Sequence, residues 1–311
     1  MDSRIAVAIC TTGKSENFYG CLTSVLRQQV LIEKFKFEDV IIVLNSKLNI
    51  LNNRLISNLA LEHSPIRINL IEEHEIGIPY ARNKALENAI GYRFNYLAFI
   101  DDDCVAEQYW LNGLITSITN FDADVSQGSY KFKYSSDYPS WMPKIPDSRF
   151  SDGQELPIAT TRSVLFCIND FVSGKLNLRF DKDLLNSGGS DTKFFYYLFM
   201  KGYKIRASSD SFVIEDMTNR QTLKWISFRY MRMGFTSFQL SFRNNDFPNS
   251  RLAELTLLSR HIKIVIKLLV NFSFTPRWTR KKELFGIFLV ESAQLVGLFR
   301  GFLNWKLKKY Y

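Results

Sequence analysis

The chain has 311 residues, of which 46% are hydrophobic and 23% charged, a composition that excludes a disordered protein. Its length allows one large domain or about two ordinary ones. The formal net charge of +9 favours anionic partners such as nucleotides, nucleic acid or an acidic membrane surface. The scattered cysteines and histidines have no spacing typical of a zinc site or a redox dithiol, which favours reduced thiols in the cytoplasm. The N-terminus lacks the apolar core of a signal peptide, so export is not expected.

Strand-like and helix-like segments alternate along the first third of the chain. Strands are expected over Ile5–Cys10, Glu38–Asn45, Arg67–Ile71 and Tyr96–Ile100, and helices over Phe18–Gln29, over residues 51–59 and over Tyr80–Ile90. Such alternation predicts an α/β fold, with a Rossmann-like, mainly parallel sheet flanked by helices. No glycine-rich dinucleotide fingerprint follows the first strand and no P-loop motif occurs, so these two nucleotide-binding classes are disfavoured.

Three consecutive carboxylates, Asp101, Asp102 and Asp103, follow the fourth expected strand. Because side chains alternate along a strand, Asp101 and Asp103 are expected to face one way and Asp102 the other. Clustered negative charges repel one another unless a cation neutralises them or water surrounds them. The carboxyl edge of such a sheet is also where ligands bind. The triplet alone leaves two interpretations open, a divalent-cation seat and a solvated acidic turn.

Further motifs follow one another in a recognisable order. They are Thr11-Thr12 after the first strand, Asn45-Ser46 after the second, Gly77-x-x-x-Ala81-Arg82-Asn83, the acidic triplet, Gly188-Gly189-Ser190-Asp191-Thr192-x-Phe194-Phe195, and Arg220-x-Thr222-x-x-Trp225 with Arg229-Tyr230-x-Arg232-x-Gly234 behind it. This set resembles the family 2 glycosyltransferases of GT-A fold, in particular the bacterial polysaccharide-forming members. The resemblance covers most of residues 4–236.

The resemblance implies an inverting, metal-dependent enzyme that moves a sugar from a nucleotide-sugar, expected to be a UDP-sugar, to a glycan or lipid-linked acceptor in surface polysaccharide biosynthesis. Asp101 and Asp103 match the metal-binding positions, and carboxylate oxygens suit Mn²⁺ or Mg²⁺. The resemblance assigns nucleotide-sugar contacts to Thr11, Asn45, Arg82, Asp101 and Asp102.

Asp191 matches the catalytic base of the family. Inversion requires an acceptor hydroxyl to attack from the face opposite the leaving diphosphate, so a carboxylate has to lie near that hydroxyl. Gly188 and Gly189 would let the backbone approach the sugar closely. Another interpretation is that Ser190 or Asp191 only caps the following helix, and the two roles are compatible.

The chain departs from the family pattern at three positions. Leu44 stands where many members have an aspartate, Ser163 where an asparagine often occurs, and Ser190 where an acidic residue precedes the base. The last departure supports a second hypothesis, a non-catalytic GT-A-like scaffold that binds a membrane or a partner glycosyltransferase. Glu215 and Asp216, after a strand expected over residues 211–214, are candidates for a further metal or acceptor contact.

The composition changes near Leu252, and we expect a catalytic domain over residues 1–236 and a basic, amphipathic helical region over residues 237–311. A spanning helix needs about twenty largely uncharged residues, and neither apolar run is expected to meet this requirement. Basic amphipathic helices fit the anionic inner face of the cytoplasmic membrane, so a cytoplasmic, peripheral location is expected. The alternative is a helical lid or a homodimer contact. The cationic surplus is terminal rather than spread along a groove, and nucleic-acid binding is not expected.

Overall fold

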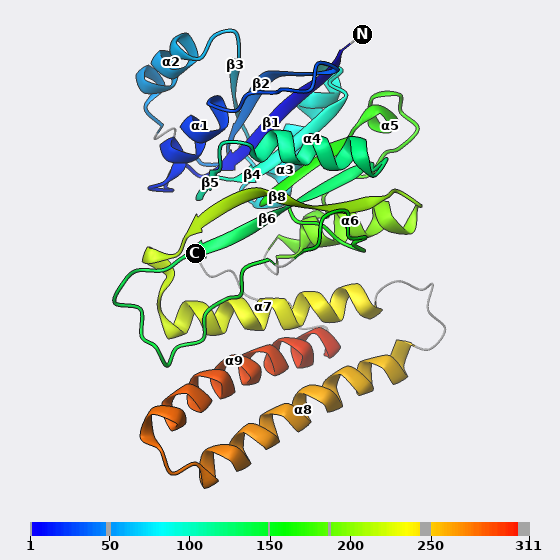
Figure 1. Cartoon of the computed structure of the whole chain (residues 1–311). Helices are drawn as coiled ribbons and strands as arrows, with labels where there is room; N and C mark the ends of the chain where they lie inside the picture. Colours follow the sequence, from blue (N-terminus) through cyan, green and yellow to red (C-terminus); the bar gives the residue numbers. More distant parts are fainter. Residues whose placement is uncertain (1, 48–50, 149, 186–187, 243–249, 304–311) are drawn as a thin grey trace. The chain divides into compact units, whose positions relative to one another are not determined.

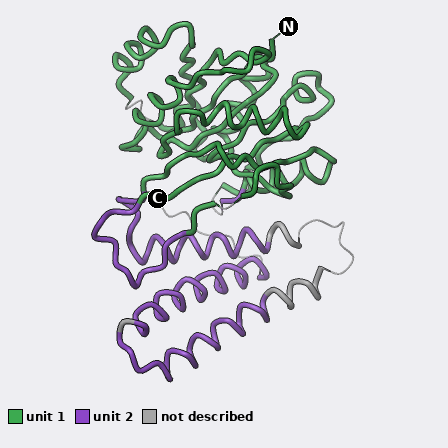
Figure 2. The backbone as a smooth tube through the Cα atoms, viewed as in Figure 1, with its two compact units in different colours: residues 1–133, 146–185, 190–216 green, residues 134–145, 186–189, 217–311 purple. Residues whose placement is uncertain are grey.

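The computed structural model describes residues 2–47, 51–148, 150–185, 188–242 and 250–303. The chain forms two compact units (Figure 2). Unit 1 contains residues 1–133, 146–185 and 190–216, and unit 2 contains residues 134–145, 186–189 and 217–311. The boundary expected at residue 236 therefore lies inside a helix of unit 2.

Unit 1 is built on one eight-stranded sheet, in the order β3-β2-β1-β4-β7-β6-β8-β5 (Figure 1). The strands are β1 (Ser3–Thr11), β2 (Phe35–Leu44), β3 (Arg67–Glu72), β4 (Tyr96–Asp101), β5 (Cys104–Ala106), β6 (Val125–Lys133), β7 (Ser163–Cys167) and β8 (Ile205–Asp216). The first four are parallel, which confirms the predicted α/β fold. Strand β7 runs antiparallel to both of its neighbours, β4 and β6, whereas β6 and β8 are parallel.

Helices cover both faces of this sheet. They are α1 (Phe18–Leu26), α2 (Asn53–Glu62), α3 (Ile78–Gly91), α4 (Trp110–Asn120), α5 (Asn169–Val172) and α6 (Ser190–Met200), with short 3₁₀ turns at Lys182–Leu184 and, in unit 2, Thr218–Arg220. In β1, alternate residues enter opposite cores, as the two-residue period of a strand requires. Ile5, Val7 and Ile9 pack with α1, α2 and α4, whereas Ala6 and Ala8 pack with α3, α5 and α6. The small side chains of Ala6 and Ala8 leave room for the phenylalanines of the second core.

The acidic triplet does not continue the strand. Strand β4 ends at Asp101, and residues 102 and 103 form a turn before β5 begins at Cys104. Strand periodicity therefore does not determine the directions of the three side chains, because it holds only while the backbone stays extended.

Unit 2 contains three long helices, α7 (Leu223–Phe242), α8 (Ser250–Phe274) and α9 (Trp278–Phe302). Helices α7 and α9 approach each other through glycines. A Cβ atom on Gly297 would lie 1.9 Å from the Met231 carbonyl oxygen, and one on Gly234 would lie 2.1 Å from that of Gln294. Backbones can come this close only where both helices present residues without side chains.

One stretch of the described chain, Arg280–Phe302, is long and apolar enough to cross a bilayer. The expectation that neither C-terminal run meets this test is therefore wrong for the second run. The test considers length and composition alone, and a buried helix of a soluble protein passes it as well. Since α9 packs closely on α7 in unit 2, the stretch is weak support for a membrane span.

Candidate active site

The strand ends of the parallel half-sheet meet at one edge of unit 1. Cys10 of β1 pairs with Asp101 of β4, and Thr11 pairs with Leu44 of β2. The Thr11 hydroxyl donates a hydrogen bond of 2.5 Å to Asp102 Oδ2 and accepts one from the Gly13 amide at 2.9 Å. The Asp102 side chain thus connects the acidic turn to the last residue of β1 through a hydrogen bond.

Asp101 lies in an environment that opposes its ionisation. Burial raises the pKa of the Asp101 carboxyl above its ordinary value, and the negative charges of Asp103 and Glu215 raise it further. The guanidinium groups of Arg82 and Arg162 act in the opposite direction. A bound cation would favour the charged form of such a carboxyl.

The side chains of Asp101 and Asp103 offer the hard oxygen ligands that Mg²⁺ and Mn²⁺ prefer. Among the described residues, no group of three His, Cys, Asp or Glu side chains is arranged to hold an ion by itself. These two carboxylates therefore fit a partial seat, which needs oxygen atoms from another molecule to complete the coordination of a divalent ion.

Arg82 is carried into the site by α3, which has Pro79 in its first turn, where proline is favoured. The side chain is buried, and its Nη1 donates a hydrogen bond of 2.9 Å to Ser190 Oγ. Its Nη2 lies 3.7 Å from Asp191 Oδ2. Ser190 therefore stands in the place of an acidic residue as an uncharged partner of Arg82.

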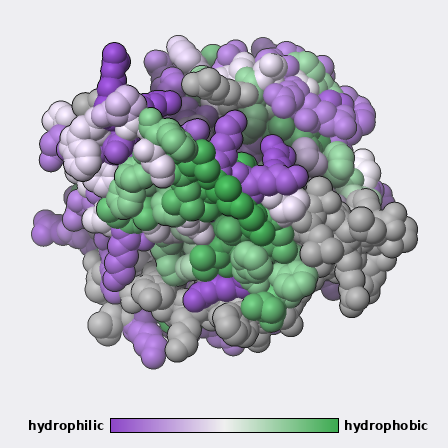
Figure 3. Space-filling view, turned by 90° about the horizontal axis from the view of Figure 1, so that it is seen from below, coloured by the Kyte–Doolittle hydropathy of each residue, from purple (hydrophilic) through white to green (hydrophobic). Residues whose placement is uncertain are grey.

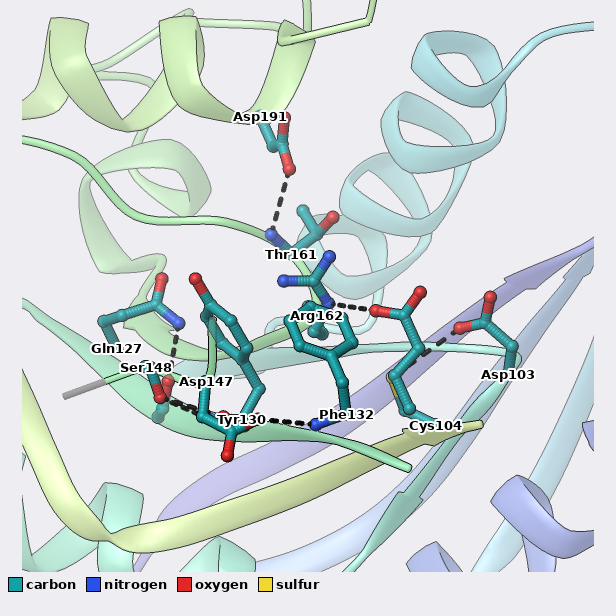
Figure 4. A network of polar contacts seen from close by, with 12 residues as sticks. Asp103, Cys104, Gln127, Tyr130, Phe132, Asp147, Ser148, Thr161, Arg162 and Asp191 are labelled. Atoms are coloured by element: carbon teal, nitrogen blue, oxygen red, sulfur yellow. Dashed lines mark hydrogen bonds and ion pairs between the residues drawn. The ribbon is translucent and has the colours of Figure 1, made fainter. Parts of the chain in front are cut away.

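Asp191 lies in the first turn of α6. It follows Gly188 and Gly189, whose φ angles of +77° and +81° favour glycine. The Asp191 carboxylate accepts a hydrogen bond of 3.3 Å from the Thr161 amide (Figure 4). This bond and the nearby Arg82 guanidinium orient the carboxylate and compensate part of its charge.

Two neighbouring residues of this site, Arg162 and Glu215, form a buried ion pair that is not part of the sequence motifs. Arg162 Nε lies 2.8 Å from Glu215 Oε2, and the exposed fractions of the two side chains are 13% and 3%. From the sequence, Glu215 is only a candidate for a further metal or acceptor contact. The signal for Arg162 was its position directly before the apolar run Ser163–Cys167, which forms β7. Figure 4 shows Arg162 near Thr161, Asp103 and Cys104.

Asn45 and Asn83 have their side-chain groups engaged with the main chain. Asn45 Nδ2 donates to the carbonyl oxygens of Glu73 and Glu75, and its Oδ1 accepts from the Gly77 amide. Asn83 exchanges two hydrogen bonds with the main chain of Phe180, at 2.8 and 2.9 Å. The Asn45 hydrogen bonds hold the loop before α3 in place. The Asn83 hydrogen bonds connect α3 to the chain before α6.

The other two departures from the family pattern have packing roles. Leu44 is buried in the core between the sheet and α1. The Ser163 hydroxyl accepts a hydrogen bond of 2.9 Å from the indole N–H of the buried Trp110. Leu44 thus contributes to the hydrophobic core of unit 1, and Ser163 has a hydrogen-bond partner inside it.

Comparisons with known proteins agree with this arrangement. The family model described as "Glycosyl transferase family 2" matches residues 6–184. Succinoglycan biosynthesis protein ExoM of Rhizobium meliloti (strain 1021) is 31% identical over 171 residues, 52% of this chain and 52% of ExoM. Glycosyltransferase AglE of Haloferax volcanii is 28% identical over 130 residues, 42% of this chain and 40% of AglE. The chain thus spans about half or less of the length of these relatives.

Solved structures extend the likeness to nearly the whole chain. The mannosyltransferase PcManGT of Pyrobaculum calidifontis, in complex with GDP-Man and Mn²⁺, superposes with a TM-score of 0.67 at 13% identity, covering 98% of this chain and 89% of that one. Residues 1–349 of S. aureus TarS give a TM-score of 0.51 at 15% identity, with coverages of 93% and 90%. At these identities the likeness concerns the fold alone. Because the family model covers more than half of the chain, the protein belongs to glycosyl transferase family 2, and its fold is the GT-A fold.

Proposed function

We propose that the protein transfers a sugar from a nucleotide-sugar, with UDP as the expected nucleotide, to a glycan or lipid-linked acceptor in surface polysaccharide biosynthesis. The observation that carries the proposal is that the buried Arg82 lies between two carboxylate sets of unit 1: it is 3.7 Å from Asp191 Oδ2, and its charge acts on Asp101. Asp101 ends β4, Asp103 lies in the turn that follows, and Asp191 lies at the start of α6 beside Arg82. The donors and the Mn²⁺ ion named for the neighbouring solved structures, and the succinoglycan role named for ExoM, support the choice of chemistry.

Asp101 and Asp103 would hold a divalent cation, Mn²⁺ or Mg²⁺, which supplies positive charge to the departing diphosphate. Thr11, Asp102 and Arg82 are the proposed contacts of the donor. For Asn45, whose side-chain groups all bond to the main chain, we propose a contribution through the loop that it holds. The guanidinium of Arg82 would also neutralise negative charge that develops on the leaving group.

Asp191 is the proposed general base. It would accept the proton of the acceptor hydroxyl as that oxygen attacks the anomeric carbon from the side opposite the diphosphate, which inverts the configuration. The Thr161 amide and Arg82 Nη2 both approach Oδ2 of Asp191, so we assign the proton to the other carboxylate oxygen, Oδ1. The contact with Arg82, 3.7 Å from Asp191 Oδ2, would help to orient the carboxylate for this step.

An Asp191→Asn variant tests the base. The amide oxygen can still accept the Thr161 hydrogen bond, so the variant is expected to fold and to bind UDP while its turnover falls by about 10²-fold or more. Asp122→Asn, which changes an exposed carboxylate paired with Lys204, is the matched control. Transfer at the wild-type rate by folded Asp191→Asn would remove Asp191 from this role.

Calorimetric titration of UDP with and without Mn²⁺ tests the metal seat. Affinity should rise with Mn²⁺ in the wild type, and the rise should vanish in Asp101→Asn and in Asp103→Asn, because each substitution removes a charged ligand. Equal UDP affinity with and without the ion in the wild type would contradict the proposed seat.

We also propose that unit 2 rests on the anionic inner face of the cytoplasmic membrane. Between residues 258 and 303 the sequence has eight Lys or Arg and two Glu. Apolar side chains of α8, α9 and their connection are exposed, with Phe274 at 83% and Trp278 at 69%. In the view of Figure 3, apolar side chains form one band with hydrophilic side chains at its borders. Cations beside exposed aromatic rings fit an anionic lipid surface.

Sedimentation with lipid vesicles tests this location. The protein should sediment with vesicles that contain about one-third phosphatidylglycerol and much less with pure phosphatidylcholine, because each cation near an anionic surface adds attraction. Lys281→Gln/Lys282→Gln should weaken the binding, whereas the control Lys34→Gln/Lys36→Gln in unit 1 should not. Equal sedimentation with both kinds of vesicle would contradict the electrostatic contribution.

A further inference from the structure

The buried Arg162 is fixed on two sides. One side is the Glu215 carboxylate, with Arg162 Nε 2.8 Å from Glu215 Oε2. The other is aromatic, since Arg162 Cζ lies 4.4 Å from the ring centroid of Tyr130 and 5.4 Å from that of Phe132. A guanidinium held between a carboxylate and aromatic faces keeps its charge and has little freedom to move. Arg162 is therefore a permanent cation in a fixed place.

In the sheet, the two residues of this ion pair flank the acidic triplet, Arg162 on the side of β4 and Glu215 on the side of β5. Ser163, directly after Arg162, pairs with Ile100, directly before Asp101. Glu215 pairs with Cys104, directly after Asp103. The positive charge of Arg162 and the negative charge of Glu215 both act on Asp101. The Glu215 carboxylate thus lies beside the two proposed metal ligands, and Arg162 forms an ion pair with one of its oxygen atoms.

We propose that Arg162 keeps Glu215 out of the coordination of the divalent cation, so that the cation binds at Asp101 and Asp103 together with the donor rather than before it. Three ionised carboxylates would form a strong cation site by themselves. Arg162 offsets one negative charge and holds Glu215 in an ion pair. The phosphate oxygens of the donor then supply the missing ligands. This inference rests on the proposed function, because it presupposes the metal seat and the diphosphate donor.

This arrangement couples the binding of the cation to that of the nucleotide. Because such coupling is reciprocal, each ligand should raise the affinity for the other by the same factor. Arg162 is a positioning residue in this scheme, and the affinity for Mn²⁺ in the absence of nucleotide reports its role directly.

Titration of nucleotide-free protein with Mn²⁺, followed by the electron paramagnetic resonance signal of the free ion, tests the proposal. Arg162→Gln should bind Mn²⁺ about tenfold or more tightly than the wild type, because a cation is lost and Glu215 becomes a third ligand. Arg162→Lys, which keeps the charge, should stay near the wild type. Arg162→Gln/Glu215→Gln should lose the gain.

Glu215→Gln alone gives an independent check if Arg162→Gln does not fold. Its affinity for nucleotide-free Mn²⁺ should fall much less than that of Asp103→Asn, because Glu215 is not a ligand while Arg162 holds it and only a nearby charge is lost. A fall as large as that of Asp103→Asn would overturn the proposal, as would unchanged or weaker Mn²⁺ binding by folded Arg162→Gln. If the wild type also shows no Mn²⁺-dependent UDP binding, the proposed metal seat fails as well. If that dependence is retained, only the role of Arg162 is refuted.

Discussion

Substitution of Asn45 tests whether this residue holds the loop before α3 or contacts the nucleotide directly. Its Nδ2 donates hydrogen bonds to Glu73 O at 3.0 Å and Glu75 O at 2.8 Å, and its Oδ1 accepts from the Gly77 amide at 2.7 Å. The residue is 5% exposed. Asn45→Ala should lower the free energy of unfolding by about 3 kcal/mol, since each of three buried hydrogen bonds contributes about 1 kcal/mol net.

Urea unfolding followed by circular dichroism and tryptophan fluorescence measures this loss. Asn45→Asp should be at least as destabilising, because it keeps the acceptor for Gly77 and sets a carboxylate against two carbonyl oxygens. Asn53→Ala on the exposed surface of α2 is the control and should change stability by less than about 0.5 kcal/mol. If Asn45→Ala leaves stability unchanged and weakens UDP binding, Asn45 contacts the nucleotide directly and the structural argument is refuted.

Three other predictions concern close packing, helix attachment and thiol chemistry. Gly297→Ala should destabilise unit 2 by about 1–3 kcal/mol, because its Cβ would lie 1.9 Å from Met231 O. Limited proteolysis of α7–α9 measures this loss. Gly91→Ala is the control, because a Cβ at Gly91 would have no atom within 4 Å. Asn83→Ala should cost about 2 kcal/mol in urea unfolding through its two bonds to Phe180, and no loss would contradict the tie between α3 and the chain before α6. Burial raises the pKa of the Cys10 thiol to about 12 and raises the pKa values of Cys21 and Cys104 as well. These three thiols should therefore react with Ellman's reagent at pH 8 only after unfolding, because the reactive thiolate is scarce below the pKa, and their rapid labelling in the native protein would refute this.

The parallel half of the fold was predictable because its signals are local. The strands expected to begin at residues 5, 38, 67 and 96 are short apolar runs bounded by polar residues, and each is followed by a turn or helix. Strand ends in a parallel sheet share one edge, so the neighbourhood of Thr11 and Asp101 could be inferred without coordinates. The turn at Asp102 could not, because no residue type there forbids continuation of the strand.

The contribution of Arg162 was not predictable by the same rule. Strand β7 is antiparallel to β4, so its amino end lies at the edge where the parallel strands have their carboxyl ends. Strand direction depends on pairing between residues far apart in the chain, which local periodicity does not report. Thr161 and Arg162 therefore reach this edge from the amino end of a strand, which the rule for parallel strands does not include. The partner of Arg162, Glu215, also depends on a distant pairing, that of β8 with β5.

The path of the chain through unit 2 has a consequence for protein engineering. Residues 134–145 leave the strand β6 and belong to unit 2, where Tyr138 and Met142 are buried with Ile226 and Val290. A truncation after residue 216 would remove Ile226 and Val290 and leave Tyr138 and Met142 without these apolar partners. Such a fragment would be prone to aggregation. Replacing residues 134–145 with a short polar turn at the same time should give a form of unit 1 that can be purified separately.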